Sequence, residues 1–572
     1  MKKALSLVLC CAMLLSCVAV ANAESYTATA KGFGGDVTVT LEITDGKLTA
    51  VTAVGANETS GIGSNAIDKM PDAMVKANSV DVDGVTGATF TSNAILEAAK
   101  EALAQSGVTL TAADTEDATA VGVEVEAETT DVLVIGGGAA GLAASISAAE
   151  NGASVILVEK LSFLGGCSKM SGGVFTRASV ESDGENAMTG DELYEFLMEC
   201  SNGLADADLV RTYVDKSVDT FNWCYDNMIS DAVTTRYAMI PDSIVSIWMP
   251  DSWATKFVSS METYAAGKNV DIRLSTPATE LIIEDGAVKG AVVTNADGSV
   301  QKIYAKGGVV LATGGFASSP EKLAQYSSAG AETIISYASA GVTGDGLDMA
   351  AAANAEIHFN DDWDTCGAFG LALKGYATAQ MHYPMLLNAA GDRFVNEANI
   401  QPTIYTAMRH EIAKGYENKF WWITDSNIES DPDQIKWLEE NVNAVTVNTV
   451  EEMAEVTGIP AEKLQATIDV YNAAAGTDND AFGKPADYNK GISAPYTIIA
   501  DEPWRTTTIG GLTITIDAEV KDTDGNPIPG LYAAGEVANA NFYGTVYTCG
   551  TAFGSAIVFG RIAGANAAAK AQ

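Results

Sequence analysis

The sequence predicts an α/β protein of several domains, α+β overall, and three observations support that class. The chain has 572 residues, more than one hydrophobic core usually serves. Residues 131–160 read as a strand, a helix and a second strand, the unit from which parallel sheets are built. Residues 24–108 instead alternate apolar and polar side chains around the turn Asp45-Gly46 and end in a helical pattern, so a small separate domain comes first.

Composition and charge exclude several classes of function. With a formal net charge of −41, the chain is a poor partner for nucleic acid or for an anionic membrane surface. Three of the eight cysteines lie in the first 23 residues, and the others are scattered without C-x-x-C spacing, so we expect neither a disulfide framework nor a metal site. Only three histidines are present, which rules out several haem groups on this polypeptide.

The first 23 residues have the pattern of a secretory signal peptide. Two lysines precede an apolar run, and Ala21-Asn22-Ala23 provides a small-residue cleavage site before Glu24. Processing as a lipoprotein at Cys17 is the alternative. Both interpretations predict an extracytoplasmic protein, periplasmic or at the cell surface, and no other run is long and apolar enough to span a bilayer.

A dinucleotide-binding motif opens the second domain. Gly136, Gly138 and Gly141 form G-x-G-x-x-G directly after an apolar strand, and Glu159 ends the next strand. Glycines at these positions allow a tight turn and the close approach of a pyrophosphate, whose charge the helix N-terminus favours, and the carboxylate takes the ribose hydroxyls. The combination of strand, glycines, helix and acid therefore predicts a bound dinucleotide.

Further segments carry a family resemblance. They are GGCSKMSGG (165–173), GGVVLATGGF (307–316), GDRFVNE (391–397), GLYAAGEV (530–537) and VFGRIAGANAA (558–568). With them, residues 130–570 resemble the fumarate reductase/succinate dehydrogenase flavoprotein superfamily, in particular its fumarate and urocanate reductase-like members. The resemblance implies a Rossmann-like FAD-binding domain at 130–354 and 506–572, with an inserted α+β capping domain at 355–505 that closes substrate against the flavin.

The same resemblance implies that FAD is bound without a covalent link. The residues that it implies as FAD contacts are Gly136, Gly138, Ala139, Ala140, Gly141, Glu159, Lys160, Gly166, Cys167, Ser168, Gly172, Gly173, Ala278, Thr313, Gly314, Gly315, Asp345, Gly535, Glu536, Thr551 and Ala552.

Residues 24–108 resemble a covalent FMN-binding domain. The family's attachment motif, D-x-x-[ST]-G-A-[ST], is matched by DGVTGAT at 83–89, which ends at Thr89. The resemblance implies that a dedicated transferase joins FMN to Thr89 through a phosphoester. Small residues leave room for the phosphate, and N–H groups of the turn can hold it. Residues 109–129, acidic and rich in Thr and Ala, read as a linker to the FAD domain.

The cationic clamp that binds dicarboxylates in the resembling reductases is missing. Those reductases have a proton-donating arginine at the position that, counted from Arg393, is Gln401 in this sequence. They have a substrate-binding histidine where this sequence has Thr507. Tyr547 stands where a second carboxylate-binding arginine is expected. A neutral amide is no general acid near pH 7, and each lost charge-assisted hydrogen bond costs about 1.5–3 kcal/mol of binding, so we expect fumarate not to be the substrate.

Tyr547 and Arg505, with Gln401, remain as the predicted catalytic residues. We predict that Tyr547 hydrogen-bonds a carbonyl of an enone or of an aryl or heteroaryl acrylate, or serves as the acid. Packing of the Tyr547 ring against the flavin is the alternative. Arg505 would hold a single carboxylate.

These features predict a reductase of activated C=C bonds in anaerobic respiration. FMN would take electrons from a membrane or surface donor and pass them to FAD, which delivers hydride to the substrate. Two alternatives stay open: a dehydrogenase of the 3-ketosteroid dehydrogenase type that works in the oxidative direction, and a non-enzymatic flavin electron-transfer protein.

Overall fold

The computed structural model describes two compact units, which meet in sequence between Asp117 and Ala118. The described residues are 24–44, 46–58, 63–82, 84, 88–108, 110, 122–180, 188–229, 234–236, 245–247, 253–327, 330–334, 336–359, 384–399, 401–425, 444–544, 548 and 550–572. The segment predicted as a signal peptide lies outside them.

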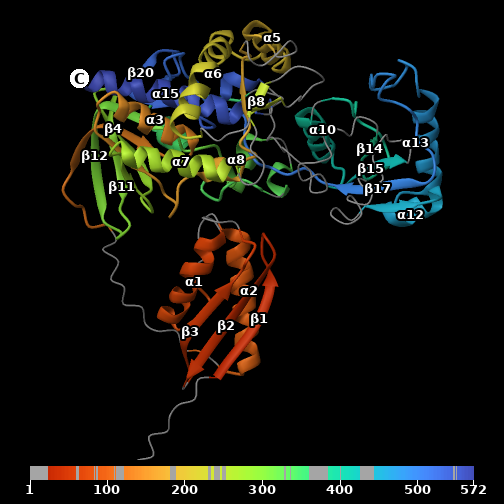
Figure 1. Ribbon diagram of the computed structural model, residues 1–572, viewed down its shortest axis with the longest axis horizontal. Coiled ribbons are helices and arrows are strands. Elements are labelled where there is room, and N and C mark those ends of the chain that lie inside the picture. Colours follow the sequence, from red (N-terminus) through yellow and green to blue (C-terminus); the bar gives the residue numbers. More distant parts are fainter. Residues whose placement is uncertain are drawn as a thin grey trace, which may run out of the picture. The chain divides into compact units, whose positions relative to one another are not determined.

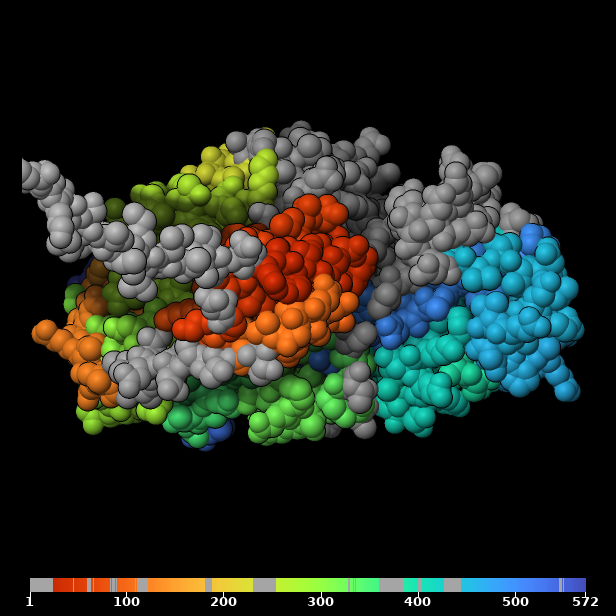
Figure 2. Space-filling model, turned by 90° about the horizontal axis from the view of Figure 1, so that it is seen from below, coloured from red at the N-terminus to blue at the C-terminus, as the bar shows by residue number. Residues whose placement is uncertain are grey.

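The first unit is a three-stranded antiparallel sheet with two helices. Strands β1 (Glu24–Lys31), β2 (Asp36–Thr44) and β3 (Lys47–Val54) pair in chain order, and helices α1 (Gly63–Ala77) and α2 (Thr89–Ser106) follow. Alternate residues of β2 are buried, so one face of the sheet packs on the helices while the other is polar. The unit is a single compact body in the space-filling view (red to orange in Figure 2).

The second unit is built on an eight-stranded sheet. Its strands are β10 (Ala278–Glu284), β11 (Ala287–Thr294), β12 (Val300–Leu311), β4 (Glu128–Ile135), β5 (Val155–Val158) and β9 (Asp271–Arg273) in spatial order, with β20 (Pro527–Ala533) beside β12 and β19 (Glu519–Lys521) beside β20. The central pairs are parallel: β20 with β12, β12 with β4, β4 with β5 and β5 with β9. Strand β5 and the second half of β4, residues 132–135, are wholly apolar and buried, as a sheet covered on both faces requires.

Two helices that lie near the beginning and at the end of this unit's sequence pack closely together (Figure 1). They are α3 (Ala139–Glu150) and α15 (Thr551–Ala571). Gly560 and Gly564 of α15 face α3: a Cβ at Gly560 would lie 2.4 Å from the Ala140 carbonyl oxygen, and one at Gly564 would lie 2.0 Å from that of Ala144. Only glycine allows such an approach, which ties the C-terminal helix to the helix that follows the dinucleotide motif.

The remaining elements of this unit surround the sheet. They are α4 (Gly166–Met170), α5 (Gly190–Cys200), α6 (Ala207–Asn227), α7 (Trp253–Gly267), α8 (Pro320–Tyr326), α9 (Asp345–Ala352), α14 (Ala540–Tyr543), a small sheet of β6 (Phe175–Arg177), β8 (Val245–Ile247) and β7 (Thr234–Arg236), and the pair β13 (Ile357–His358) with β18 (Gly511–Leu512).

The segment predicted as a capping domain contains its own four-stranded antiparallel sheet. Strands β14 (Met385–Leu387), β15 (Phe420–Asp425), β17 (Tyr496–Asp501) and β16 (Val445–Val447) pair in that order, accompanied by α10 (Gln401–Ala413), α12 (Val450–Thr457) and α13 (Ala461–Ala473). Phe420 and Trp422 enter one apolar cluster, while Trp421 and Ile423 enter another. Both faces of this sheet are therefore covered.

Candidate functional site

The glycine-rich motifs meet at one edge of the large sheet. Ile135, at the end of β4, pairs with Leu311 of β12 and Val158 of β5, and Leu311 pairs in turn with Ala533 of β20. Because these strands are parallel, the loops after them leave the same edge of the sheet, where ligands of open α/β sheets bind. The predicted FAD residues that follow these four strands are thus brought together.

The loop after β4 has the geometry that a pyrophosphate requires. Gly136 adopts φ +108°, and a Cβ there would lie 2.3 Å from the Ala312 carbonyl oxygen. Helix α3 then starts at Ala139 after Gly138, which provides no side-chain cap, and Ser168 Oγ of α4 accepts the Ala139 N–H at 3.1 Å. This helix start can receive an anion.

Glu159, the predicted ribose ligand, lies directly after β5 and is buried. One carboxylate oxygen accepts the Gly137 N–H at 2.7 Å, and the other accepts the Leu161 N–H at 2.8 Å. Burial raises the pKa of Glu159 in spite of these bonds. Each carboxylate oxygen has a second lone pair, so Glu159 can hold the motif loop and still accept from a hydroxyl.

Two more predicted FAD residues contact each other. Lys160 Nζ lies 2.6 Å from Asp345 Oδ2, at the first residue of α9, and 2.6 Å from the Thr343 hydroxyl. Burial opposes ionisation of Asp345, but the Lys160 and Thr343 hydrogen bonds prevail and lower its pKa. The carboxylate is therefore ionised at neutral pH and fixes α9 against the end of β5.

A buried carboxylate occupies the loop after β20. Glu536 Oε1 accepts the backbone N–H of Thr508 at 2.7 Å and the Thr508 hydroxyl at 3.0 Å, and burial raises the pKa of Glu536. In the loop after β12, the Thr313 hydroxyl is buried without a hydrogen-bond partner. An unpaired buried hydroxyl in a loop of this kind is expected where a polar cofactor supplies the partner, so the residues present fit FAD.

The other predicted FAD residues lie in several elements of the second unit. Gly166, Cys167 and Ser168 are in α4, Gly172 and Gly173 follow it, Ala278 starts β10, Gly314 and Gly315 follow Thr313, Gly535 precedes Glu536, and Thr551 and Ala552 begin α15. Cys167 Sγ accepts the Ser339 N–H at 3.2 Å, and burial first, then the nearby Glu536, raises the thiol pKa to about 12. Cys167 is therefore a neutral thiol and no nucleophile.

Among the three predicted catalytic residues, Arg505 is the one whose side chain the structure describes. Its Nε donates to the Ala317 carbonyl at 2.6 Å and its Nη1 donates to the Ala331 carbonyl. Burial, and then the neighbouring Arg409, lower the pKa of Arg505 to about 10. Gln401 is the first residue of α10, with no description of its side chain, and Tyr547 lies outside the described residues. Whether these three converge stays a prediction.

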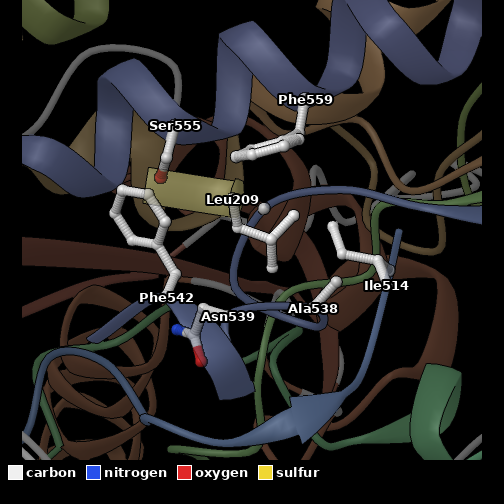
Figure 3. Close-up of a pocket in the computed structure, with 8 residues that line it drawn as sticks. Leu209, Ile514, Ala538, Asn539, Phe542, Ser555 and Phe559 are labelled. Atoms are coloured by element: carbon white, nitrogen blue, oxygen red, sulfur yellow. The ribbon is translucent and has the colours of Figure 1, made fainter. Parts of the chain in front are cut away.

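One small pocket lies between α15 and the segment that follows β20 (Figure 3). Its lining comes from Leu209, Ile514, Gly535, Ala538, Asn539, Phe542, Ser555 and Phe559, mostly apolar side chains with space for about one water molecule. A substrate does not fit there.

Sequence reasoning missed two residues that hold this edge together. Thr508 Oγ1 accepts the Phe316 N–H at 3.3 Å and bonds Glu536, while Asn539 bonds the Gly510 N–H and the Thr508 carbonyl at 2.9 and 3.0 Å. Asn539 lies three residues after Glu536, a spacing that could have suggested a role beside the flavin motif.

In the first unit, α2 begins at Thr89, the predicted attachment residue. The N-cap residue Ala88 makes no side-chain cap hydrogen bond. The positive end of a helix dipole favours a phosphate, so this helix start fits FMN. Asp83, Thr86 and Gly87 of the motif lie outside the described residues.

The fold and these two sites define a flavoprotein oxidoreductase with two flavin-binding units. Residues 131–553 match the family model of the FAD binding domain, and residues 32–104 match that of the FMN-binding domain. The chain belongs to this FAD-binding family, in its fumarate and urocanate reductase-like branch, and its cofactors are FAD and FMN.

Several relatives are named as reductases. The chain is 32% identical to urocanate reductase of Eggerthella lenta over 96% of this chain and 93% of that protein. It is 28% identical to vinyl phenol reductase of Lactiplantibacillus plantarum over 77% of this chain and 96% of that protein. The fold is also similar to a solved structure, the open conformation of a flavocytochrome c3 fumarate reductase. The TM-score is 0.60 at 28% identity, over 78% of this chain and 79% of that one. The chain is a flavin-dependent enzyme that reduces C=C bonds.

Within the described part of the chain, no helix has the length and apolar character needed to cross a bilayer.

Proposed function

We propose that the enzyme reduces the activated C=C bond of an aryl or heteroaryl acrylate, or of an enone, with electrons that pass from FMN on Thr89 to FAD. The observation that supports this best is the convergence of the FAD motifs at one sheet edge, in a chain whose relatives include reductases named for urocanate and for vinyl phenol. The lack of the dicarboxylate clamp supports an acceptor other than fumarate.

Bound FAD supplies a hydride to one alkene carbon, and the neighbouring carbon takes a proton, so the product has gained two electrons and two protons. The chain's own residues must orient the alkene and provide the proton. Tyr547 is our candidate for hydrogen-bonding the substrate carbonyl or for donating that proton, because a phenol can do both. Gln401, as an amide, can bind but cannot donate a proton near pH 7.

Arg505 is our candidate for a single carboxylate of the substrate. A guanidinium has five N–H donors, and two nitrogens of Arg505 bond main-chain carbonyls. Those two bonds fix the plane of the guanidinium, and the other donors are available for an anion. A buried cation attracts a carboxylate strongly because water screens it little.

The proposal includes the cellular setting. Residues 1–23 would direct export, a transferase would attach FMN, and a membrane or surface carrier would supply electrons in anaerobic respiration. Covalent attachment suits such a setting because a flavin that dissociated outside the membrane would be lost.

An anaerobic acceptor screen with reduced viologen tests the function. The panel contains enoates, aryl acrylates, imidazole acrylates, enones and fumarate, with holoenzyme matured in the presence of its transferase. Fast oxidation of the reduced viologen in the presence of an aryl acrylate, a heteroaryl acrylate or an enone supports the proposal. Fast turnover of fumarate would contradict our interpretation of the missing clamp, and no oxidation by any alkene would favour a dehydrogenase or an electron carrier.

A further inference from the structure

Two exposed aromatic rings lie side by side in the FMN-binding unit. Phe33 is in the turn between β1 and β2, and Phe90 is the second residue of α2, directly after Thr89. Their ring centroids are 6.1 Å apart with planes inclined by 51°, and the residues are 39% and 50% exposed. Large exposed aromatic side chains that gather beside a ligand attachment point favour a contact with that ligand.

Glu58 joins the two segments that carry these rings. One oxygen of its carboxylate accepts the Gly34 N–H at 3.0 Å, next to Phe33, and the other accepts the Thr91 hydroxyl at 2.6 Å, next to Phe90. Thr91 is only 2% exposed, so this second bond is shielded from water. The turn and the helix start are thus fixed with respect to each other by one side chain.

The packing around Glu58 leaves it little freedom. Gly63 lies against both partners of the shielded bond: a Cβ there would lie 2.7 Å from Glu58 Oε2 and 2.8 Å from Thr91 Oγ1. Glycine is therefore required at this position for the carboxylate to reach the hydroxyl. A carboxylate held so closely in the loop after β3 positions the aromatic pair rather than merely solvating the surface.

We infer that the Phe33–Phe90 pair is the wall against which the isoalloxazine ring of FMN packs, and that Glu58 is the positioning residue of this wall. A flavin tethered at residue 89 carries a flat aromatic ring system on a short chain, next to the first ring that it can cover, that of Phe90. Contact between flat rings and the removal of exposed apolar surface both stabilise this arrangement. The inference rests on FMN attachment at Thr89.

The test measures how well the wall shields FMN in the full-length holoenzyme. Iodide quenching of flavin fluorescence is recorded per attached FMN, after subtraction of the FAD signal of the Thr89→Ala protein, together with the FMN reduction potential. The variants are Phe33→Ala, Phe90→Ala and Glu58→Gln. Val54→Ala is the matched control, because Val54 is an apolar residue of the same unit that is 61% exposed on β3.

We expect the iodide quenching constant to rise severalfold in both phenylalanine variants and less in Glu58→Gln, with a shifted FMN potential in all three and wild-type values in Val54→Ala. The inference would be overturned if both phenylalanine variants had the same quenching constant and FMN potential as Val54→Ala. Unchanged quenching with slower electron transfer from FMN to FAD would also overturn it, because the pair would then contact the other unit. A wild-type chain without FMN by mass spectrometry would instead refute the attachment at Thr89.

Discussion

Lys160 Nζ and Asp345 Oδ2 lie 2.6 Å apart and join the end of β5 to the start of α9. These residues are 185 positions apart in the chain, and both belong to the set that the family resemblance implies for FAD. The contact is partly exposed, with side-chain accessibilities of 26% and 40%, so its own contribution to stability is modest. Its importance is in holding together two segments that the family resemblance implies for FAD binding, the loop after β5 and the start of α9.

Lys160→Met is therefore expected to weaken FAD binding by about 1 kcal/mol, the upper range for a partly exposed pair. The measurement is FAD titration of the apoprotein. Lys322→Met is the matched control, because Lys322 forms an equally short ion pair with Asp348 of the same helix and belongs to no FAD motif. Equal losses of affinity in the two variants would contradict a specific role for Lys160.

The close contact of α15 with α3 gives a second prediction. Gly560→Ala inserts a methyl group 2.4 Å from the Ala140 carbonyl oxygen, so the helices must separate, at a cost of about 1–3 kcal/mol in the free energy of unfolding. Because α3 begins at the dinucleotide motif, FAD should also dissociate at a lower temperature. Thermal unfolding, with FAD release followed by fluorescence, measures both.

Gly267→Ala is the control for that substitution. Gly267 ends α7, and a Cβ there would have no atom within 4 Å. The added methyl group should leave the unfolding temperature nearly unchanged. Identical behaviour of the two alanine variants would show that α3 and α15 can separate without cost.

Much of the FAD site is predictable because its requirements are local. A buried parallel strand needs a continuous apolar run, and the turn after it needs glycine where φ is positive, as at Gly136. Both signals are visible within a few residues of sequence. The opening of the loops at one edge then follows from the parallel pairing of the strands, whereas the order of the strands in the sheet was not predicted.

The rest of the site depends on contacts between residues distant in sequence. Thr508 acts through bonds to Phe316 and Glu536, and nothing in the run Thr506-Thr507-Thr508 indicates which hydroxyl turns inward. The same holds for Glu58, 33 positions before Thr91. Side-chain direction in a loop is decided by packing from other segments, and a single sequence carries little information about it.

A buried ionic cluster in the capping segment gives a pH-dependent prediction. Arg393 bonds Glu397 and Asp480, and Lys484 Nζ lies 3.5 Å from Glu397 and 2.8 Å from the Tyr471 hydroxyl. Burial lowers the pKa of Lys484 to about 8, below the value near 10.4 expected in an unfolded chain. Between these values the unfolded state binds more protons than the folded state, so the linked contribution to stability rises with pH.

Lys484→Met should remove this dependence. We expect the unfolding temperature of the wild-type protein to rise relative to that of the variant between pH 8 and pH 10, and the difference to stay constant below pH 8. Comparing slopes rather than absolute temperatures cancels the groups common to both proteins. Parallel curves over the whole range would mean that Lys484 titrates normally.

The attachment of FMN is testable by mass. Protein matured with its transferase should carry one FMN on Thr89, Thr89→Ser should retain it, and Thr89→Ala should lose it, because the phosphoester needs a hydroxyl at this position. Peptide mapping identifies the residue. FMN found on Thr86 or Thr91 instead, or persisting in Thr89→Ala, would refute the attachment point.

The proton donor is the last and least constrained part of the site, and Tyr547→Phe examines it. Loss of the hydroxyl removes a donor without changing the ring, so kcat should fall by about 10²-fold or more if the phenol donates the proton, and the alkaline limb of the pH–rate profile should disappear. Tyr225→Phe is the control, because Tyr225 is an exposed tyrosine of α6 that belongs to none of the predicted site residues. If only KM rises in Tyr547→Phe, the phenol binds the carbonyl and the proton comes from elsewhere. If neither constant changes, Tyr547 is a packing residue, and Arg505 becomes the group to vary next.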